Sequence, residues 1–354
     1  MSRLSSLYFY PHSRRAVLLQ LASFLGGSIA IAACSQAEES SSLIVGFLMG
    51  AGGLGDLSFN DMTYAGLQKA QRKYGSQILV IPQELAKATD QEAARENAMK
   101  ALIREKPSLI VVNGFEFQDL TKRYAEKYPS IRFLINDVEL SGLPNVAYTS
   151  YGQHEGSFLA GALAAWMSKT KKVGVIGGVD IDVVKAFHQG YQEGVAYADP
   201  SVQVRETFVS RVPDFSGFSN PEVGYQLAIE QYEQGADIVF AVAGFTGNGV
   251  IRAAKDQNKL AIGVDADQDH LAAGNVLTSM MKRLDNVTLA EVSKVVDGNF
   301  KAGGTYYGLK EGGVSLSPMK YTRQLIPPEI LQKLEDTQNK IIAGEIQVTN
   351  VLGG

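Results

Sequence analysis

Short apolar runs alternate with longer amphipathic stretches from Leu43 to the end of the chain. The first run is LIVGFLMG, and a helical pattern over residues 61–74, closed by Gly75, follows it. Apolar runs of four to eight residues are typical of buried strands, and strands that alternate with helices favour a mostly parallel sheet. The pattern therefore predicts an α/β protein with helices on both faces of its sheets.

The alternation starts again after residue 150, where a helical pattern over residues 155–168 opens a second series of strands and helices. We therefore predict two α/β lobes of Rossmann-like architecture, which also fits a chain of 354 residues. The predicted strands are 43–50, 78–82, 109–112, 132–135 and 145–150, then 172–176, 202–209, 237–243, 260–264 and 275–282, with two short strands within 305–316.

Turn and cap residues place the ends of several helices. Thr89-Asp90-Gln91-Glu92 reads as a capping box, and Asn220 followed by Pro221 marks the start of another helix. Asn248 is the expected N-cap of a helix over 250–256, between two apolar runs. The second of these runs ends in Asp265, and ligands of open parallel sheets bind at this carboxyl edge.

The first 42 residues follow a different pattern. A basic pair, Arg14-Arg15, precedes an apolar segment and a run of small residues that ends at Cys34, which predicts a signal peptide over 1–33. Ile31-Ala-Ala-Cys34 resembles a bacterial lipobox, so Cys34, the only cysteine, is the expected site of lipidation. Residues 34–42 form a polar tether. A short membrane anchor is the alternative, and both the Sec and the twin-arginine route stay open.

Charge and composition limit the partners. The whole chain is 45% hydrophobic and 20% charged, as in ordinary globular proteins. Removal of residues 1–33 leaves 30 basic against 37 acidic residues, a net charge of −7. Such a protein repels nucleic acid and anionic lipid, so we expect no nucleic-acid partner and attachment to the cell membrane through lipid chains.

Motifs for catalysis or cofactors are weak. Residues 50–55 fit G-x-G-x-x-G, but the helix starts too late for a dinucleotide site. Asp265, Asp267 and Asp269 alternate as in a calcium loop, yet His270 and Val276 stand where glycine and glutamate are needed. The histidines lack metal-ligand spacing and no G-x-S-x-G occurs. We therefore predict no catalytic residues, no metal and no cofactor.

Polar and aromatic residues gather where predicted strands end. Two lobes whose strand ends face each other form a cleft, and these residue types suit a ligand with a flat apolar part and several hydroxyls. Taken singly, the same aromatics fit a core and the same polar residues fit helix caps or surface ion pairs. The candidate ligand-binding residues are Asp56, Phe59, Asn60, Tyr64, Asn113, Asp119, Asp137, Phe187, Gly244, Asp265 and Lys282.

Six motifs in one order carry a resemblance to a known family. They are Asp56-x-Ser-Phe-Asn60, Gly114-Phe115 with Asp119, Gly177-Gly-x-Asp180 with Phe187, residues 241–251, residues 262–268 and Thr278-Ser-Met-Met-Lys282-Arg. Together they resemble the basic membrane protein (BMP) family of lipoproteins over about residues 44–308. Members of that family are substrate-binding components of ABC importers, and the best understood bind purine nucleosides.

The resemblance implies a type I periplasmic-binding-protein fold with two Rossmann-like lobes joined by a three-stranded hinge. The expected lobes are residues 43–148 plus 276–308 and residues 149–275 plus 309–354, with chain crossings near 148–152, 268–276 and 308–316. It also implies a monomer that captures a nucleoside by hinge closure and delivers it to ABC permease subunits.

The resemblance assigns a role to each candidate residue. Asp56 and Asn60 would contact the ligand, with Phe59 or Tyr64 as one stacking wall and Phe187 as the other. Gly244 would present its backbone, and Asp265 and Lys282 would hold ribose hydroxyls. Asn113 with Asp119 or Asp137 would read the base edge.

Two alternatives stay open at this point. A ligand-sensing module of the same fold would share every residue discussed. A nucleoside-processing enzyme would need an acidic metal-holding cluster near the start of the fold, where only Asp56 and Asp61 occur.

Overall fold

The computed structural model describes residues 42–86 and 88–352. The expected signal peptide, Cys34 and all of the tether except Ser42 lie outside this range. Within it, no helix is both long enough and apolar enough to span a membrane.

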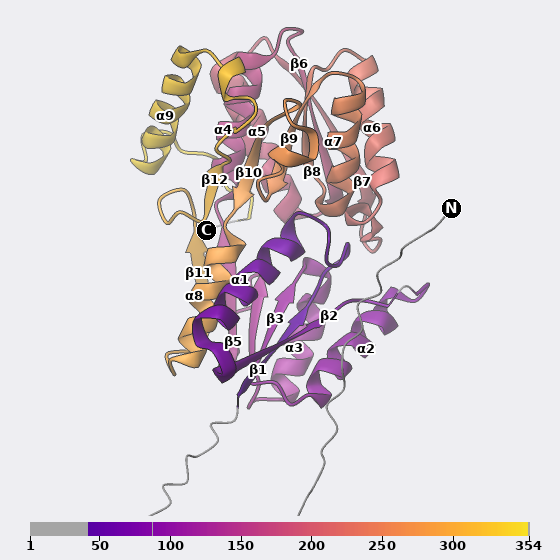
Figure 1. The fold of residues 1–354 in the computed structure, drawn as a ribbon, viewed down its shortest axis with the longest axis vertical. Coiled ribbons are helices and arrows are strands. Elements are labelled where there is room, and N and C mark those ends of the chain that lie inside the picture. Colours follow the sequence, from indigo (N-terminus) through magenta and orange to yellow (C-terminus); the bar gives the residue numbers. More distant parts are fainter. Residues whose placement is uncertain (1–41, 87, 353–354) are drawn as a thin grey trace, which may run out of the picture. The chain divides into compact units, whose positions relative to one another are not determined.

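The first lobe is built on a six-stranded sheet of order β11-β5-β4-β3-β1-β2, and all of its strand pairs are parallel. Its strands are β1 (Leu43–Leu48), β2 (Ile78–Gln83), β3 (Leu109–Asn113), β4 (Arg132–Asn136), β5 (Val146–Tyr151) and β11 (Gly303–Tyr307). The helices on it are α1 (Phe59–Tyr74), α2 (Gln91–Arg104), α3 (Gln118–Lys127) and α8 (Leu284–Val296). Figure 1 shows α8 and β11, in orange, beside the indigo and purple elements of this lobe.

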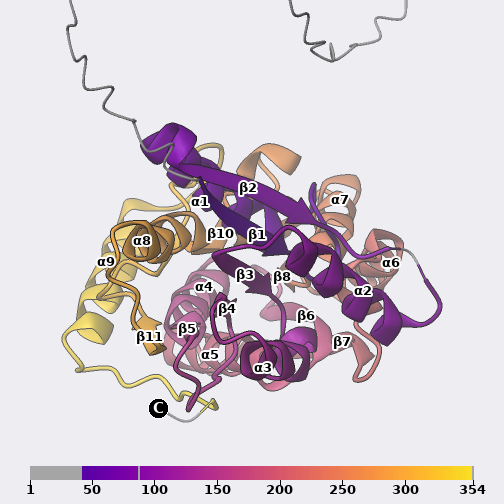
Figure 2. The same ribbon diagram turned by 90° about the horizontal axis from the view of Figure 1, so that it is seen from below.

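Alternate residues of the first sheet bury against different helices. Phe47 and Val111 face α1 and α8, whereas Leu48 and Val112 face α2 and α3. This two-sided burial explains why the strands read as continuous apolar runs. Figure 2 shows α8 and α1 on one side of the sheet and α3 and α2 on the other.

The second lobe has a six-stranded sheet of order β12-β10-β9-β8-β6-β7, parallel except for the short edge strand β12. Its strands are β6 (Lys172–Asp180), β7 (Gln203–Arg211), β8 (Ile238–Val242), β9 (Leu260–Asp265), β10 (Val276–Lys282) and β12 (Val314–Leu316). Its helices are α4 (Gln153–Met167), α5 (Asp182–Ala198), α6 (Pro221–Glu233), α7 (Gly247–Asp256) and α9 (Pro328–Ile342). The predicted two-lobed α/β fold is confirmed.

The chain passes between the lobes after β5, after β10 and after β11. The expected division at residue 276 is wrong for β10, which pairs with β9 and β12 in the second sheet. The reason is burial: six of the seven residues of β10 are buried, as suits an inner strand rather than a connection. The second crossing therefore lies at Arg283, between β10 and α8. The first sheet also extends through β5 to Tyr151, three residues beyond the expected boundary at 148.

The helix caps agree with the sequence at one place and differ at two. Asn220 caps α6, and Pro221 is its first helical residue, as predicted. At α2 the cap is Asp90, whose side chain accepts a bond from the amide of Ala93, so the capping box from Thr89 does not form. α7 begins at Gly247, before Asn248, and the side chain of Asn248 bonds instead to the carbonyl of Asp56 in the other lobe.

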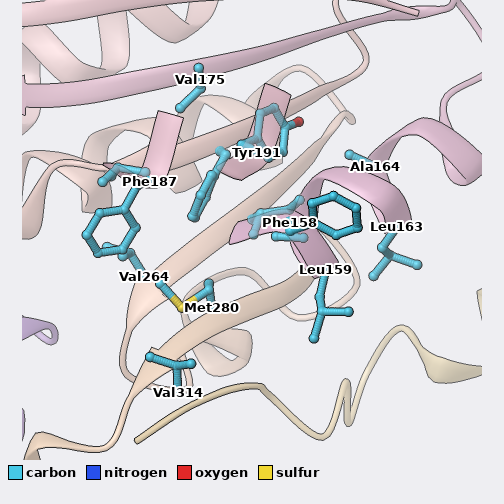
Figure 3. Packing of buried hydrophobic residues seen from close by; sticks show 14 of the residues in the cluster. Phe158, Leu159, Leu163, Ala164, Val175, Phe187, Tyr191, Val264, Met280 and Val314 are labelled. Atoms are coloured by element: carbon cyan, nitrogen blue, oxygen red, sulfur yellow. The ribbon is translucent and has the colours of Figure 1, made fainter. Parts of the chain in front are cut away.

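The core of the second lobe depends on a close approach of α4 and α5. Side chains from both helices, among them Phe158 and Tyr191, fill the space beneath the sheet (Figure 3). The helix backbones approach each other at glycines. A Cβ added at Gly190 would lie 2.1 Å from the carbonyl oxygen of His154, and one at Gly194 would lie 2.0 Å from that of Phe158.

This contact predicts the sign of one substitution. Gly190→Ala should improve helix propensity by about 1 kcal/mol, but the added methyl overlaps the α4 backbone, and overpacking costs about 1–3 kcal/mol or more. We expect a lower free energy of unfolding, measured by urea denaturation. As a control, Ala196→Gly on the exposed face of α5 should cost only the propensity difference of about 1 kcal/mol. A more stable Gly190→Ala protein would contradict the close packing.

Candidate functional site

A cavity lies between the lobes, where the carboxyl ends of both sheets meet. It comprises about 660 Å³ of atom-free space, of which about 90 Å³ is accessible to water. Its walls are mostly apolar, with a few charged and polar groups, which is typical of ligand sites. The lining residues are Gly50, Ala51, Asp56, Phe59, Asn60, Gly114, Phe115, Glu116 and Asp137 from the first lobe, and Ile181, Val183, Val184, Phe187, Phe218, Val242, Gly244, Val264, Asp265 and Lys282 from the second.

Asp56 holds the start of α1 against the cavity. Its carboxylate accepts bonds from the backbone amides of Ser58, Asn60 and Asp61 at 2.9, 2.8 and 3.1 Å. These amides are the free donors of a helix N-terminus. Burial raises the pKa of Asp56 to about 6, although the three amide bonds oppose the shift.

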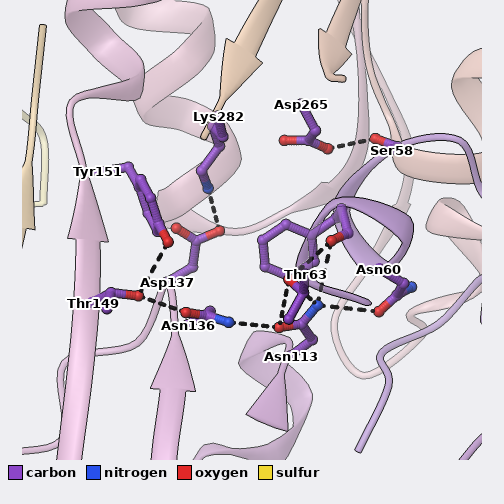
Figure 4. Close-up of polar contacts among 11 residues, drawn as sticks. Ser58, Asn60, Thr63, Asn113, Asn136, Asp137, Thr149, Tyr151, Asp265 and Lys282 are labelled. Carbon is purple, nitrogen blue, oxygen red and sulfur yellow. Dashed lines mark hydrogen bonds and ion pairs between the residues drawn. The ribbon is translucent and has the colours of Figure 1, made fainter. Parts of the chain in front are cut away.

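Asn60 is fixed by a chain of buried amides (Figure 4). The amide of Gly50 donates to Asn60 Oδ1 at 3.1 Å, and Asn113 Nδ2 donates to the same oxygen at 3.4 Å. Asn136 Nδ2 in turn donates to Asn113 Oδ1 at 2.8 Å, and Thr149 Oγ1 donates to Asn136 Oδ1 at 2.6 Å. The network links β3, β4 and β5, so Asn60 has one orientation toward the cavity.

Lys282 brings a positive charge into this buried place. Its side chain is only 1% exposed, and its ammonium pairs with Asp137 of the first lobe. The ammonium also lies 5.1 Å from the ring centre of Phe59, 4.6 Å from that of Tyr151 and 5.6 Å from that of Phe187. An ammonium within about 6 Å of a ring face is attracted to it. One carboxylate and three rings thus stabilise a charge that water does not reach.

Two aspartates occupy matching positions in the two lobes. Asp137 directly follows β4 and Asp265 ends β9, and both have a positive φ of 64°. Aspartate tolerates this left-handed conformation better than most residues. The turn carries both carboxylates toward the cavity, so the local backbone decides where these charges lie.

Asp265 combines burial with a contact across the lobes. Its carboxylate accepts a bond from Ser58 Oγ of the first lobe (Figure 4). Burial raises its pKa to about 6; Lys282 and Ser58 oppose this shift, whereas the negative charges of Asp137 and Asp56 add to it. Near neutral pH the carboxylate is therefore ionised and able to accept hydrogen bonds.

The loop before α1 is held by the second lobe at further points. Asn248 Nδ2 donates to the carbonyl of Asp56 at 3.1 Å, and Gln268 Nε2 donates to the carbonyl of Leu57 at 2.9 Å. With the bond from Ser58 to Asp265, three consecutive residues contact the second lobe. The lobes are therefore joined at the cavity as well as at the hinge.

Eight of the eleven candidate residues line this cavity: Asp56, Phe59, Asn60, Asp137, Phe187, Gly244, Asp265 and Lys282. Tyr64 does not, because it stacks on Phe47 of β1 with ring centres 6.3 Å apart. Asn113 is fully buried behind the cavity wall, where it orients Asn60. Asp119 lies on the exposed face of α3, so its expected contact with a base edge is wrong.

Several lining residues were not singled out from the sequence. Glu116 follows Gly114, whose φ of 115° turns the chain back so that Glu116 Oε1 accepts a bond from the amide of Ala51 at 3.0 Å. Burial raises the pKa of Glu116. The glycine was the available signal. For Phe218, which reaches the cavity from the loop between β7 and α6, residue spacing offers none.

The arrangement is that of a bilobal solute-binding protein, and comparison with known proteins agrees. The family model of PnrA-like ABC transporter substrate-binding proteins matches residues 44–351. Basic membrane protein A1 of Borrelia garinii subsp. bavariensis is 30% identical over 83% of this chain and 84% of its own. A protein named as an uncharacterized lipoprotein of Pyrococcus horikoshii is 29% identical over 92% of this chain and 84% of its own.

Solved structures give the same result. The crystal structure of an ABC transporter solute-binding protein from Aeropyrum pernix superposes with a TM-score of 0.76 at 27% identity, over 86% of this chain and 92% of that one. The chain belongs to the PnrA-like, basic membrane protein family of ABC transporter substrate-binding proteins. Its fold is the type I periplasmic-binding-protein fold, as expected.

The raised pKa of Asp265 predicts a dependence of stability on pH. The carboxyl titrates at about 6 in the folded protein against an ordinary value of 3.8, so the folded state binds this proton more tightly. Its contribution to the free energy of unfolding is therefore largest at low pH and is lost as pH rises to about 6. Asp265→Asn cannot ionise and should gain up to about 3 kcal/mol relative to wild type between roughly pH 4 and 7, measured by urea denaturation.

A matched control has the opposite sign. Lys171 and Ser201 lower the pKa of Asp199, so Asp199→Asn should lose stability relative to wild type as pH rises. A constant difference between Asp265→Asn and wild type over the same range would contradict the burial of an ionisable Asp265.

Proposed function

We propose that this protein is a lipid-anchored substrate-binding protein that captures a purine nucleoside between its lobes and delivers it to an ABC permease. The observation that carries the proposal is the composition of the cavity. Aromatic rings from both lobes, Phe59 and Phe187, lie there with the carboxylates Asp56 and Asp265 and the ammonium of Lys282.

A nucleoside fits these groups part by part. A flat base stacks on aromatic rings, with about 1–3 kcal/mol per base. Ribose hydroxyls donate to ionised carboxylates, and such charge-assisted bonds are worth about 1.5–3 kcal/mol each. Asp265 and Lys282 are assigned to the ribose, whereas Asn60 and Asp137 are assigned to the polar edge of the base. Gly244, with a φ of 54°, presents backbone without a side chain.

Ligand entry requires the lobes to separate. The water-accessible space of about 90 Å³ is too small for a base joined to a sugar, and the ion pair of Lys282 with Asp137 spans it. Opening at the three crossings would part this pair and release the loop before α1. Closure would then replace the contact between Asp137 and Lys282 by contacts to the ligand, which is the hinge mechanism of bilobal clamps.

Export and anchoring follow from the amino-terminal segment. We propose that residues 1–33 are removed, that Cys34 is lipidated and that residues 34–42 tether the lobes to the outer face of the cell membrane. The lipoprotein name of the Pyrococcus relative supports this proposal. We propose further that the mature protein acts as a monomer and that the ABC permease subunits are its protein partners.

Binding is tested by thermal unfolding of residues 35–354 with purine and pyrimidine nucleosides, free bases and sugars. A nucleoside at a hundred times its dissociation constant should add about 2.7 kcal/mol to the free energy of unfolding. Asp265→Asn should weaken nucleoside binding roughly 10- to 100-fold near neutral pH, because it loses a charged acceptor worth about 1.5–3 kcal/mol.

Each variant is compared with its own midpoint without ligand, because Asp265→Asn also changes stability. Asp119→Asn, on the exposed face of α3, is the matched control and should bind like wild type. Full retention of affinity in Asp265→Asn would contradict the site, and a midpoint shift with sugars alone would replace the nucleoside by another ligand. Recovery of intact nucleoside after incubation distinguishes binding from hydrolysis.

A further inference from the structure

A second cavity adjoins the first on the hinge side, and we call it the annex. The two share three lining residues, Phe115, Asp137 and Val183, but about 740 Å³ of the annex is accessible to water against about 90 Å³ of the central cavity. The other residues that line the annex are Gln118, Val138, Glu139, Tyr148, Ser150, Tyr151, Gln153, Asp182, Gly304, Thr305, Tyr306, Asn350 and Leu352.

Gln153 is the unusual member of this wall. It is the first residue of α4, directly after the first crossing, and it is only 1% exposed. Neither its amide nitrogen nor its amide oxygen has a hydrogen-bond partner among the described residues. A buried polar group without a partner costs about 1–3 kcal/mol, and native proteins rarely leave both ends of one amide in this state.

Asp137 offers a second group from the opposite lobe. Its Oδ2 accepts from Lys282, whereas its Oδ1 is buried and has no partner among the residues that the structure describes. The annex thus presents a donor and two acceptors, with Gln153 on the second lobe and Asp137 on the first. A group bonded to both would bridge the lobes.

The charge of the annex limits what it accepts. Three carboxylates line it, those of Asp137, Glu139 and Asp182, and no lysine or arginine does. Lys185 lies 3.4 Å from Asp182 at the exposed rim, and Lys282 faces the central cavity. Carboxylates disfavour an anion nearby and favour hydroxyl, amide or ammonium donors.

We infer that the annex is a subsite for a substituent of the bound ligand, and that it takes a neutral or cationic hydrogen-bonding group and rejects phosphate. This inference rests on the proposed function, because the parent nucleoside fills the central cavity. The substrate class is then nucleosides that carry a hydroxylated or amine-bearing substituent, and nucleotides are excluded. Gln153 is the residue that determines this specificity.

The test compares ligands that share one nucleoside. Adenosine, 5′-amino-5′-deoxyadenosine, N6-(2-hydroxyethyl)adenosine and adenosine 5′-monophosphate are titrated into residues 35–354 by calorimetry, with wild type and Gln153→Leu. We expect at least one of the two substituted nucleosides to bind as tightly as adenosine or tighter, and the monophosphate to bind at least tenfold more weakly.

Gln153→Leu should lower the affinity for the accepted substituent about fivefold, as for one or two net hydrogen bonds, and leave adenosine unchanged. The variant should fold, because leucine removes an unpartnered amide at similar size. Ser157→Ala, one turn along α4, is the matched control: its hydroxyl is also buried and has no partner among the described residues, but it does not line the annex.

The outcomes separate the two proposals. If adenosine binds but both substituted nucleosides are rejected, or if Gln153→Leu leaves their affinity unchanged, the annex inference is overturned and the proposed function stands. Tight binding of the monophosphate overturns the annex inference as well. If none of the nucleosides binds wild type, both proposals fail together.

Discussion

The buried ammonium of Lys282 is the interaction on which the cleft depends. A charge with 1% exposure is very costly without compensation, and the compensation comes largely from the other lobe, through Asp137 and Phe59. Tyr151, at the first crossing, and Phe187, in the second lobe, complete its surroundings. The side chain therefore has its full set of partners only when the lobes are together, which couples the local electrostatics of one lysine to the state of the hinge.

The carboxylates around the cleft are a consequence of the same geometry. Asp56, Asp137 and Asp265 all follow strands at the carboxyl edge of a sheet, where chain turns rather than side-chain packing place them. Burial raises the pKa of Asp56 and of Asp265 to about 6, so the free carboxylates are held at a cost that a hydroxylated ligand can reduce. The site is ready for hydrogen-bond donors in the way that binding sites generally are, with polar groups that lack full solvation.

The sequence was sufficient to predict the two-lobed α/β fold, because the strands are buried on both faces and bounded by turns. It was also sufficient for Asp265 and Lys282, which end apolar runs. It failed for β10 because a strand next to a crossing has the same pattern whichever sheet it joins. It failed for Tyr64 and Asp119 because the direction of a helical side chain depends on how the helix packs. Glu116, Phe218 and Gln153 could not be found from spacing, since only tertiary contacts bring them to the cleft.

The glycine contacts between α4 and α5 have a consequence for how motion in this protein can be observed. Backbones that touch directly leave the second lobe little freedom to bend internally, so this lobe should move as one piece. Trp166, the only tryptophan of the chain, belongs to α4 and travels with that piece. A spectroscopic label on the exposed face of α2, paired with Trp166, would therefore report the hinge angle itself rather than a local rearrangement.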